Sequence, residues 1–474
     1  MKIIFLILPF ILISTRENKN LIFVMTHFRH GARAPTHLDS KNLDLLGEEW
    51  DKEGALTGVG KRMQYLLGYR NRLRYVDQYN FLSEKYNSTE IKVVSSYKER
   101  AQESILAHLQ GLYPPNKNLG ETLNEKQINN ADPPVNIEDP EIDREKIELG
   151  NNTLPNSMTI IPFESIDISS NKSCRGEGTD NSSNIIAVVN KFNELYLEKF
   201  SEFINSDNQN NYTFEEVGDI CSDYICSYVD GRSMTTFSEF IDLDEFYNFC
   251  MDVFLLKVGE TKVTSNITEY AFGTYFMRLL VDFTKLKVDE DIGKSESSSI
   301  NPKMLIISGH DTSMSTHQFF LQFALGKSMD FFRTTTFTSQ MAFEIERNND
   351  DKTDRDYSDY FISYYFNDEL LLNMTLDEFF NKVEPHILSD EEINSICNFD
   401  TDSDGDKENS QSNSTIKYKI ITNNKYHIAP LIVFASLFGV SLLVNVFLVY
   451  KLFKRISNPI PNQNINLSEV NKQV

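Results

Sequence analysis

The stretch THFRHGARAP, residues 26–35, follows the apolar run 21–25, which is typical of a buried strand. It sets Arg29, His30 and Arg33 close together at the end of that strand. Planar guanidinium groups bind phosphate oxygens in pairs, and a neutral imidazole between them can attack phosphorus. The stretch therefore predicts a phosphate-binding strand end with a candidate nucleophile.

Two later stretches follow the same order of a short apolar run, charged residues and a helical pattern. Residues 91–95 precede Arg100, and residues 303–307 precede His310 and Asp311. Strands that alternate with helices predict an α/β fold with a largely parallel sheet, whose ligand site lies beyond the carboxyl ends of its strands. If these strands are neighbours, three arginines, two histidines and one carboxylate gather around one hollow.

The remaining periodic segments divide into a core and an insertion. Helices are predicted over residues 56–75 (with Thr57 as N-cap), 101–110, 185–204, 243–258, 267–286, 313–325 and 376–383, and strands over 337–345 and 358–366. We expect an α/β core over residues 16–114 and 296–399 and an inserted, mainly α-helical cap over 115–295. The helices of the insertion are expected to be packing helices.

Composition narrows the class of protein. The 474 residues carry a net charge of −23, which argues against a nucleic-acid partner because such proteins present a basic face. An acidic surface suits an acidic or extracytoplasmic compartment, where partial protonation of carboxylates relieves self-repulsion. We expect neither a metal nor another cofactor, and the sequence leaves open whether the protein forms a homodimer.

The two ends predict a type I membrane protein. Residues 1–15 have the short apolar core of a signal peptide. Residues 428–450 carry no charge and would be about 34 Å long as a helix, enough to span a bilayer. Residues 400–427 are predicted to be an acidic stalk, and residues 451–474, which begin with a basic cluster, a cytoplasmic tail.

This topology bears on glycosylation and disulfides. Asn-x-Ser/Thr sequons on the predicted lumenal side are at Asn87, Asn151, Asn171, Asn181, Asn211, Asn266, Asn373 and Asn413. In an oxidising compartment most cysteines should pair, and an odd number leaves one over. The cysteines are Cys174, Cys221, Cys226, Cys250 and Cys397.

These motifs carry a resemblance to a known family. RHGARAP resembles the RHGxRxP signature of the histidine acid phosphatases, branch 2 of the histidine phosphatase superfamily, and SGHD at 308–311 resembles that family's His-Asp motif. The stretch 93–115 is similar to the segment around the family's third phosphate-binding arginine, and 54–75 to its LTxxG helix. The resemblance implies a phosphoglycerate mutase-like α/β sandwich.

The resemblance also implies roles for six residues in phosphomonoester hydrolysis. His30 would be the nucleophile that forms a phosphohistidine, and Asp311 the proton donor. Arg29, Arg33, Arg100 and His310 would bind the phosphate. Nearby guanidiniums should keep His30 neutral at acid pH, and bound phosphate should raise the pKa of Asp311.

Some positions depart from the family pattern or remain unassigned. Arg100 stands in Lys-Glu-Arg-Ala where the family has an Asp-Arg-Thr triplet, Met63 replaces a usual Gln, and residues 337–339 read Phe-Thr-Ser instead of Tyr-Ala-Ser. The resemblance implies a Cys174–Cys397 bridge, while Cys221, Cys226 and Cys250 stay unassigned. Of the other histidines, only His37 is a candidate for the substrate entrance; the rest, and Trp50, are expected to be surface or packing residues.

The expectation is therefore a membrane-anchored acid phosphatase facing the extracellular space or a lysosome-like lumen. Three alternatives stay open: a phytase-like or lipid-phosphate-selective relative, a non-catalytic surface glycoprotein on the same fold, and a phosphoglycerate mutase-like transferase. The last is usually cytosolic and lacks a signal and an anchor.

Overall fold

A computed structural model describes most of the first 397 residues. The described residues are 20–37, 50–117, 120–131, 133, 140–166, 183–199, 212–234, 238–239, 241–258, 266–294, 301–328, 331–348 and 354–397. The chain divides into two units, Met1–Thr401 and Asp402–Val474, and every described residue belongs to the first.

The predicted terminal segments lie outside the described residues. This applies to the signal peptide 1–15, the stalk 400–427, the transmembrane segment 428–450 and the tail 451–474. Within the described part of the chain, no helix is both long and apolar enough to cross a membrane.

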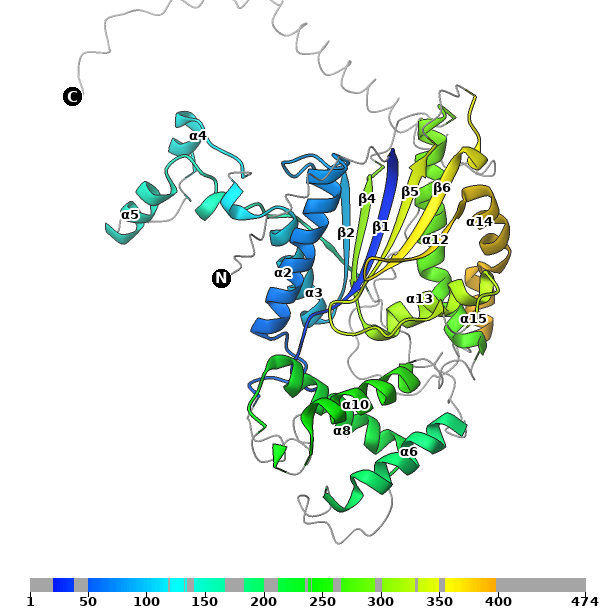
Figure 1. Ribbon diagram of the computed structural model, residues 1–474. Helices are drawn as coiled ribbons and strands as arrows, with labels where there is room; N and C mark the ends of the chain where they lie inside the picture. Colours follow the sequence, from blue (N-terminus) through cyan, green and yellow to red (C-terminus); the bar gives the residue numbers. More distant parts are fainter. Residues whose placement is uncertain are drawn as a thin grey trace, which may run out of the picture. The chain divides into compact units, whose positions relative to one another are not determined.

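The described strands form one seven-stranded sheet in the order β3-β2-β4-β1-β5-β6-β7 (Figure 1). The strands are β1 (Leu21–Arg29), β2 (Ile91–Ser96), β3 (Glu164–Ile166), β4 (Met304–Gly309), β5 (Gln340–Arg347), β6 (Tyr360–Phe366) and β7 (Glu369–Thr375). Strands β3, β2, β4 and β1 pair in parallel, whereas β5, β6 and β7 are added antiparallel. The α/β prediction is confirmed, with a parallel arrangement where the three predicted strand ends meet.

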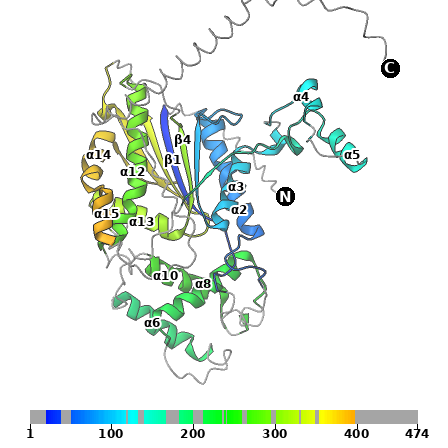
Figure 2. The ribbon, with the colours of Figure 1, turned by 180° about the vertical axis from the view of Figure 1, so that it is seen from behind.

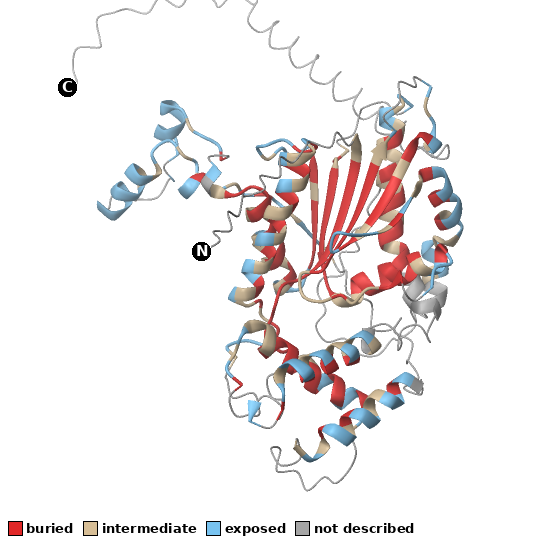
Figure 3. Ribbon diagram, viewed as in Figure 1, coloured by how far each residue is buried: buried red, intermediate tan, exposed pale blue. Residues whose placement is uncertain are grey.

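Helices cover both faces of the sheet, as Figures 1 and 2 show from opposite sides. They are α2 (Gly58–Arg72) and α3 (Glu99–Leu112) on one face and α12 (Asn266–Asp291), α13 (Asp311–Ala324) and α14 (Leu376–Val383) on the other. Because side chains alternate along a strand, Val24 and Phe28 of β1 pack with α3, while Phe23 and Met25 pack with α12 and α13. The central strands are accordingly buried along most of their length (Figure 3).

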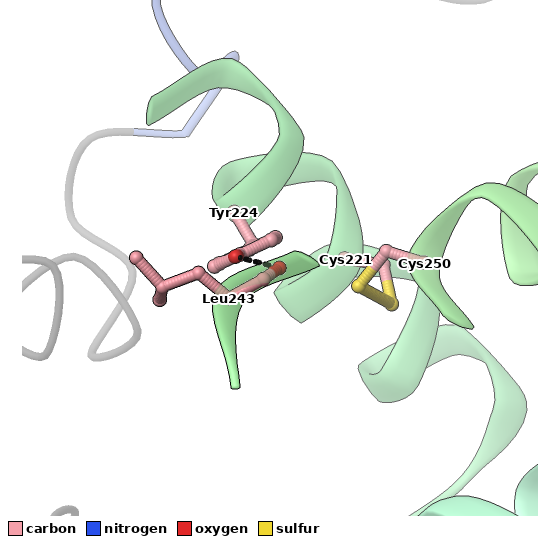
Figure 4. The surroundings of a disulfide bond; sticks show 4 residues. All are labelled: Cys221, Tyr224, Leu243 and Cys250. Atoms are coloured by element: carbon pink, nitrogen blue, oxygen red, sulfur yellow. Dashed lines mark hydrogen bonds between the residues drawn. A yellow bond between two sulfur atoms is a disulfide. The ribbon is translucent and has the colours of Figure 1, made fainter. Parts of the chain in front are cut away.

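Three further helices form a cap with a hydrophobic core of its own: α6 (Ser183–Leu195), α8 (Phe214–Asp230) and α10 (Leu243–Val258). Tyr224 and Phe246 lie in this core, and a Cys221–Cys250 disulfide joins α8 to α10 (Figure 4). The Tyr224 hydroxyl donates a hydrogen bond of 2.6 Å to the carbonyl of Leu243. The sequence indicated α6 and α10 as packing helices, but not α8.

Two elements from the predicted insertion belong to the core. Strand β3 extends the sheet beside β2, and α12 packs against β1. The predicted cap boundaries at 115 and 295 stay a prediction, but the sequence between them contributes to both layers.

The remaining elements are short or peripheral. They are η1 (Leu73–Gln78), η2 (Pro115–Lys117), α4 (Glu125–Asn129), α5 (Pro140–Leu149), η3 (Pro155–Ser157), η6 (Tyr357–Asp359), η7 (Glu384–His386) and α15 (Asp390–Cys397).

Two minor predictions can be compared with this fold. Trp50 packs against the core of the cap, and the Arg232 guanidinium lies 3.4 Å from the centre of its ring, so Trp50 is a packing residue as expected. The predicted Cys174–Cys397 bridge lies outside the described residues, because Cys174 and the side chain of Cys397 are not described.

Candidate active site

The three predicted strand ends lie side by side. Arg29 at the end of β1 is in register with Gly309 at the end of β4, and the His30 amide donates to the Gly309 carbonyl at 3.0 Å. This pairing sets the rings of His30 and His310 5.4 Å apart, centre to centre. His310 Nε2 lies 2.9 Å from the hydroxyl of Ser96 at the end of β2.

The hydrogen bonds of His30 assign its tautomer. Nδ1 lies 2.8 Å from the Gly31 carbonyl, which can only accept, so the proton is on Nδ1. Nε2 therefore carries a lone pair, and the Nε–H of Arg100 donates to it at 3.1 Å. Burial and then the charges of Arg100 and Arg29 hold the pKa of His30 well below its usual value. The imidazole is thus neutral, as the sequence predicted.

Arg29 joins β1 to the start of α13. Its Nη2 forms an ion pair of 2.8 Å with Asp311 Oδ2, and its Nη1 donates to the Thr335 carbonyl at 2.8 Å. Burial raises the pKa of Asp311, but the positive charges of Arg29 and Arg33 outweigh the effect of burial and hold that pKa below its usual range. Asp311 is therefore ionised beside Arg29.

The other two arginines complete an electropositive hollow. Burial, followed by the charge of Arg33, lowers the pKa of Arg100 to about 10, so its guanidinium keeps its charge. Arg33 Nη1 donates to the Ala34 carbonyl at 2.8 Å. The buried Nε atoms of Arg29 and Arg33 have no hydrogen-bond partner within the described part of the chain. Positively charged donors that lack a partner, next to the Asp311 carboxylate, are suited to binding an anionic ligand.

A close approach of two glycines holds the loop after β1 against α2. A Cβ on Gly31 would collide with the Gly60 carbonyl, and one on Gly60 with the Ala32 carbonyl. Thr57 caps α2 as predicted, since its hydroxyl accepts from the Gly60 amide at 3.1 Å. The RHG and LTxxG motifs therefore form one packed unit.

Two residues of α2 contribute to the site in ways that the sequence did not indicate. Gln64, fully buried, donates from Nε2 to the Arg29 carbonyl at 2.7 Å. Met63, expected only to pack, lines the cavity beside Arg29 and Arg33. The sequence offered no signal for Gln64, because packing of α2 buries this position and no apolar pattern marks it.

Behind His310 lies a second, fully buried pair of histidines, His27 and His317. Their Nδ1 atoms are 3.5 Å apart, and His27 Nε2 lies 3.1 Å from the Ser313 hydroxyl. That hydroxyl accepts from the His310 amide at 2.9 Å. Both histidines were expected to be surface or packing residues, and the structure shows that they are buried supports of the His310 loop.

The cap closes the site on its apolar side. A partly open cavity of about 210 Å³, here called the Phe254 pocket, lies between Arg29 and Arg33 of the core and helices α8 and α10 of the cap. Its apolar lining includes Ile225, Val229, Tyr247, Met251, Phe254 and Phe337. Cys226, a free and buried thiol, lies 3.5 Å from Arg33 Nη1. The sequence did not predict these cap residues.

Two other positions lie away from this cavity. His37, a candidate for the substrate entrance, is exposed and is not among the described lining residues. A larger open hollow of about 670 Å³ lies at the opposite end of β1, against residues 20–22, and contains none of the predicted site residues.

The fold and this arginine-histidine centre define an α/β protein with an electropositive site at the carboxyl ends of its parallel strands. Residues 20–367 match the histidine phosphatase superfamily (branch 2), and the chain belongs to that family. This confirms the resemblance noted from the motifs.

Individual relatives match over shorter stretches. The chain is 38% identical to lysosomal acid phosphatase of Xenopus laevis over 111 residues, which cover 23% of this chain and 24% of the relative. It is 37% identical to venom acid phosphatase Acph-1 of Apis mellifera over 94 residues, 19% and 24% of the two chains. The matched regions thus span about a quarter of these relatives. A solved structure of Hafnia alvei phytase aligns with a TM-score of 0.47 at 13% identity, over 80% of this chain and 99% of the phytase.

Proposed function

We propose that this protein is an acid phosphatase that hydrolyses phosphate monoesters through a phosphohistidine at His30 Nε2. The observation that carries the proposal is the neutral, fixed imidazole, whose Nε2 lone pair faces Arg100 while Nδ1–H is held by the Gly31 carbonyl. The named relatives are acid phosphatases, which supports the same reaction class.

In the first step, the phosphate group binds among Arg29, Arg33, Arg100 and His310. His30 Nε2 attacks phosphorus in line with the ester oxygen, the N–P bond forms, and the P–O bond to the alcohol breaks. Asp311 gives its proton to the departing oxygen. Because bound phosphate brings negative charge beside Arg29, it raises the pKa of Asp311 and allows that carboxyl to carry a proton.

In the second step, water attacks the phosphohistidine. Asp311, now ionised, takes a proton from the water, the N–P bond breaks, and inorganic phosphate leaves. The guanidiniums stabilise the charge on the equatorial oxygens in both steps.

The topology is part of the proposal. We infer a signal peptide at residues 1–15 and a membrane helix at 428–450, with the phosphatase unit in the extracellular space or a lysosome-like lumen. The lysosomal relative supports this compartment, as does the Cys221–Cys250 disulfide. The sequons at Asn87, Asn151 and Asn373 are exposed, as glycan acceptors must be.

The direct test is His30→Ala. We expect release of inorganic phosphate from p-nitrophenyl phosphate at acid pH to fall by about 10³-fold or more, since the attacking atom is removed. Acid-quenched wild-type enzyme should carry acid-labile phosphate after reaction with a radiolabelled substrate, and the variant should carry none.

His37→Ala is the matched control, because His37 is exposed and lies outside the pocket. It should keep wild-type turnover and labelling. If His30→Ala kept its turnover, the assignment of His30 as the nucleophile would be wrong. A folded wild-type protein without any phosphatase activity would favour the non-catalytic glycoprotein.

A further inference from the structure

The Phe254 pocket is continuous with the phosphate-binding centre. Arg29, which pairs with Asp311, lies with its guanidinium carbon 4.3 Å from the ring centre of Phe337 and 5.0 Å from that of Phe254. A phosphate held by Arg29 is therefore within a few atoms of both rings. The group esterified to that phosphate has this pocket as its immediate surroundings.

The chemistry of the lining restricts that group. Among the described residues around the pocket, Arg29 and Arg33 are the only charged ones, and both face the phosphate centre. The cap lining from α8 and α10 is mainly aliphatic, thioether and aromatic, and the uncharged polar groups of the lining are the Ser222, Tyr247 and Thr336 hydroxyls and the Cys226 thiol. A ring bearing several phosphates would need further cations there, and a polyol would bring more hydroxyls than these few polar groups can pair. An apolar group gains from leaving water.

We infer that the Phe254 pocket is the leaving-group subsite, and that it selects phosphomonoesters of compact, uncharged apolar alcohols over polyol and polyphosphorylated substrates. The inference rests on the proposed phosphatase activity and extends it to a substrate class. It also opposes the phytase-like alternative, because inositol polyphosphates belong to the disfavoured class.

The test compares matched alkyl esters on the wild-type protein. Cyclohexyl phosphate and myo-inositol 1-phosphate share a six-membered carbon ring and differ in ring hydroxyls. The inositol oxygen is the better leaving group, so intrinsic reactivity works against the expected preference. We expect kcat/KM, measured by phosphate release, to favour cyclohexyl phosphate by about tenfold or more. Benzyl and n-hexyl phosphate then distinguish a ring from a linear chain as the preferred apolar group.

Two substitutions on α10 test whether the Phe254 pocket causes the preference for cyclohexyl phosphate. Phe254→Ala should reduce the cyclohexyl-to-inositol ratio by about tenfold, since it removes a large part of the apolar wall. Leu255→Ala is the matched control: Leu255 follows directly on α10, is 38% exposed and does not line the pocket. It should leave the ratio unchanged. Phe254→Leu should restore much of the preference.

The outcomes separate the two proposals. Equal kcat/KM for both esters, or efficient hydrolysis of phytate, would contradict the proposed leaving-group subsite. Either result would still agree with the proposed phosphatase activity. An unchanged ratio in a folded Phe254→Ala protein would contradict the subsite in the same way. If no monoester, including p-nitrophenyl phosphate, is hydrolysed, the proposed function itself fails. Thermal melting of each variant establishes that it is folded.

Discussion

At the scale of single residues, the same guanidinium charges lower the pKa of two neighbouring groups, His30 and Asp311. Burial and guanidinium charge both disfavour protonation of His30. For Asp311 the same charges outweigh burial, so its carboxyl is ionised until a phosphate anion arrives. In the proposed mechanism, one cluster of arginines thus keeps the His30 imidazole unprotonated and makes the proton of Asp311 depend on the substrate.

This arrangement predicts how Asp311→Asn should behave. Alkyl phosphates need a proton on the leaving oxygen, and p-nitrophenyl phosphate does not. We expect kcat/KM to fall by about 10²–10⁴ for an alkyl phosphate and much less for p-nitrophenyl phosphate. Steady-state kinetics on the two esters measure the difference. Equal losses on both would mean that Asp311 acts only through its ion pair with Arg29.

At the scale of elements, the contact between the loop after β1 and the start of α2 positions the arginines. Gly60→Ala would place a methyl group against the Ala32 backbone, so the loop carrying Arg33 must shift. We expect a loss of about 1–3 kcal/mol in unfolding free energy, together with weaker phosphate binding. Urea denaturation and inhibition by inorganic phosphate measure the two effects.

Gly58→Ala is the control on the same helix. A Cβ at Gly58 meets nothing within 4 Å, so this variant should keep both properties. If Gly60→Ala were equally neutral, the glycine contact would have no role in positioning the site.

Helix α8 and strand β7 were both missed from the sequence. Helix α8 was missed although Thr213 and Glu216 form a capping box at its start and Gly231 ends it in the left-handed region. Strand β7 is largely exposed and follows a tight turn in which Asn367 and Asp368 have positive φ. That Asn-Asp pair was the usable turn signal. Strand β2 and helix α14 matched their predictions closely, because clear apolar patterns end at clear boundaries.

At the scale of the whole molecule, buried histidines should make the unliganded protein acid-sensitive. Burial lowers the pKa of His27, His108 and His310 to about 3, and holds those of His30 and His317 well below 6.5. The unfolded chain therefore binds more protons below about pH 6.5, and stability falls as pH decreases from there towards about 3. Each such group costs roughly 2 kcal/mol at about pH 5.

The double variant His27→Leu/His317→Leu should reduce this sensitivity, because both positions are apolar enough to hold leucine beside Phe276 and Phe343. We expect the fall in Tm between about pH 7 and pH 5 to be clearly smaller than in the wild type. Calorimetry at the two pH values measures it. The same pH dependence in both proteins would show that these histidines do not control acid stability.

The sequence by itself determined the α/β class, the strand ends that carry the charged residues, and the identity of all six candidate site residues. These follow from local patterns and motifs, since a strand, its carboxyl end and the side chains after it are neighbours in sequence. Only the tertiary structure decided that Arg100 faces His30 Nε2, that Gln64 holds the Arg29 carbonyl, and that Phe254 lies over Arg29. Such contacts join side chains from separate elements, and packing between layers sets them.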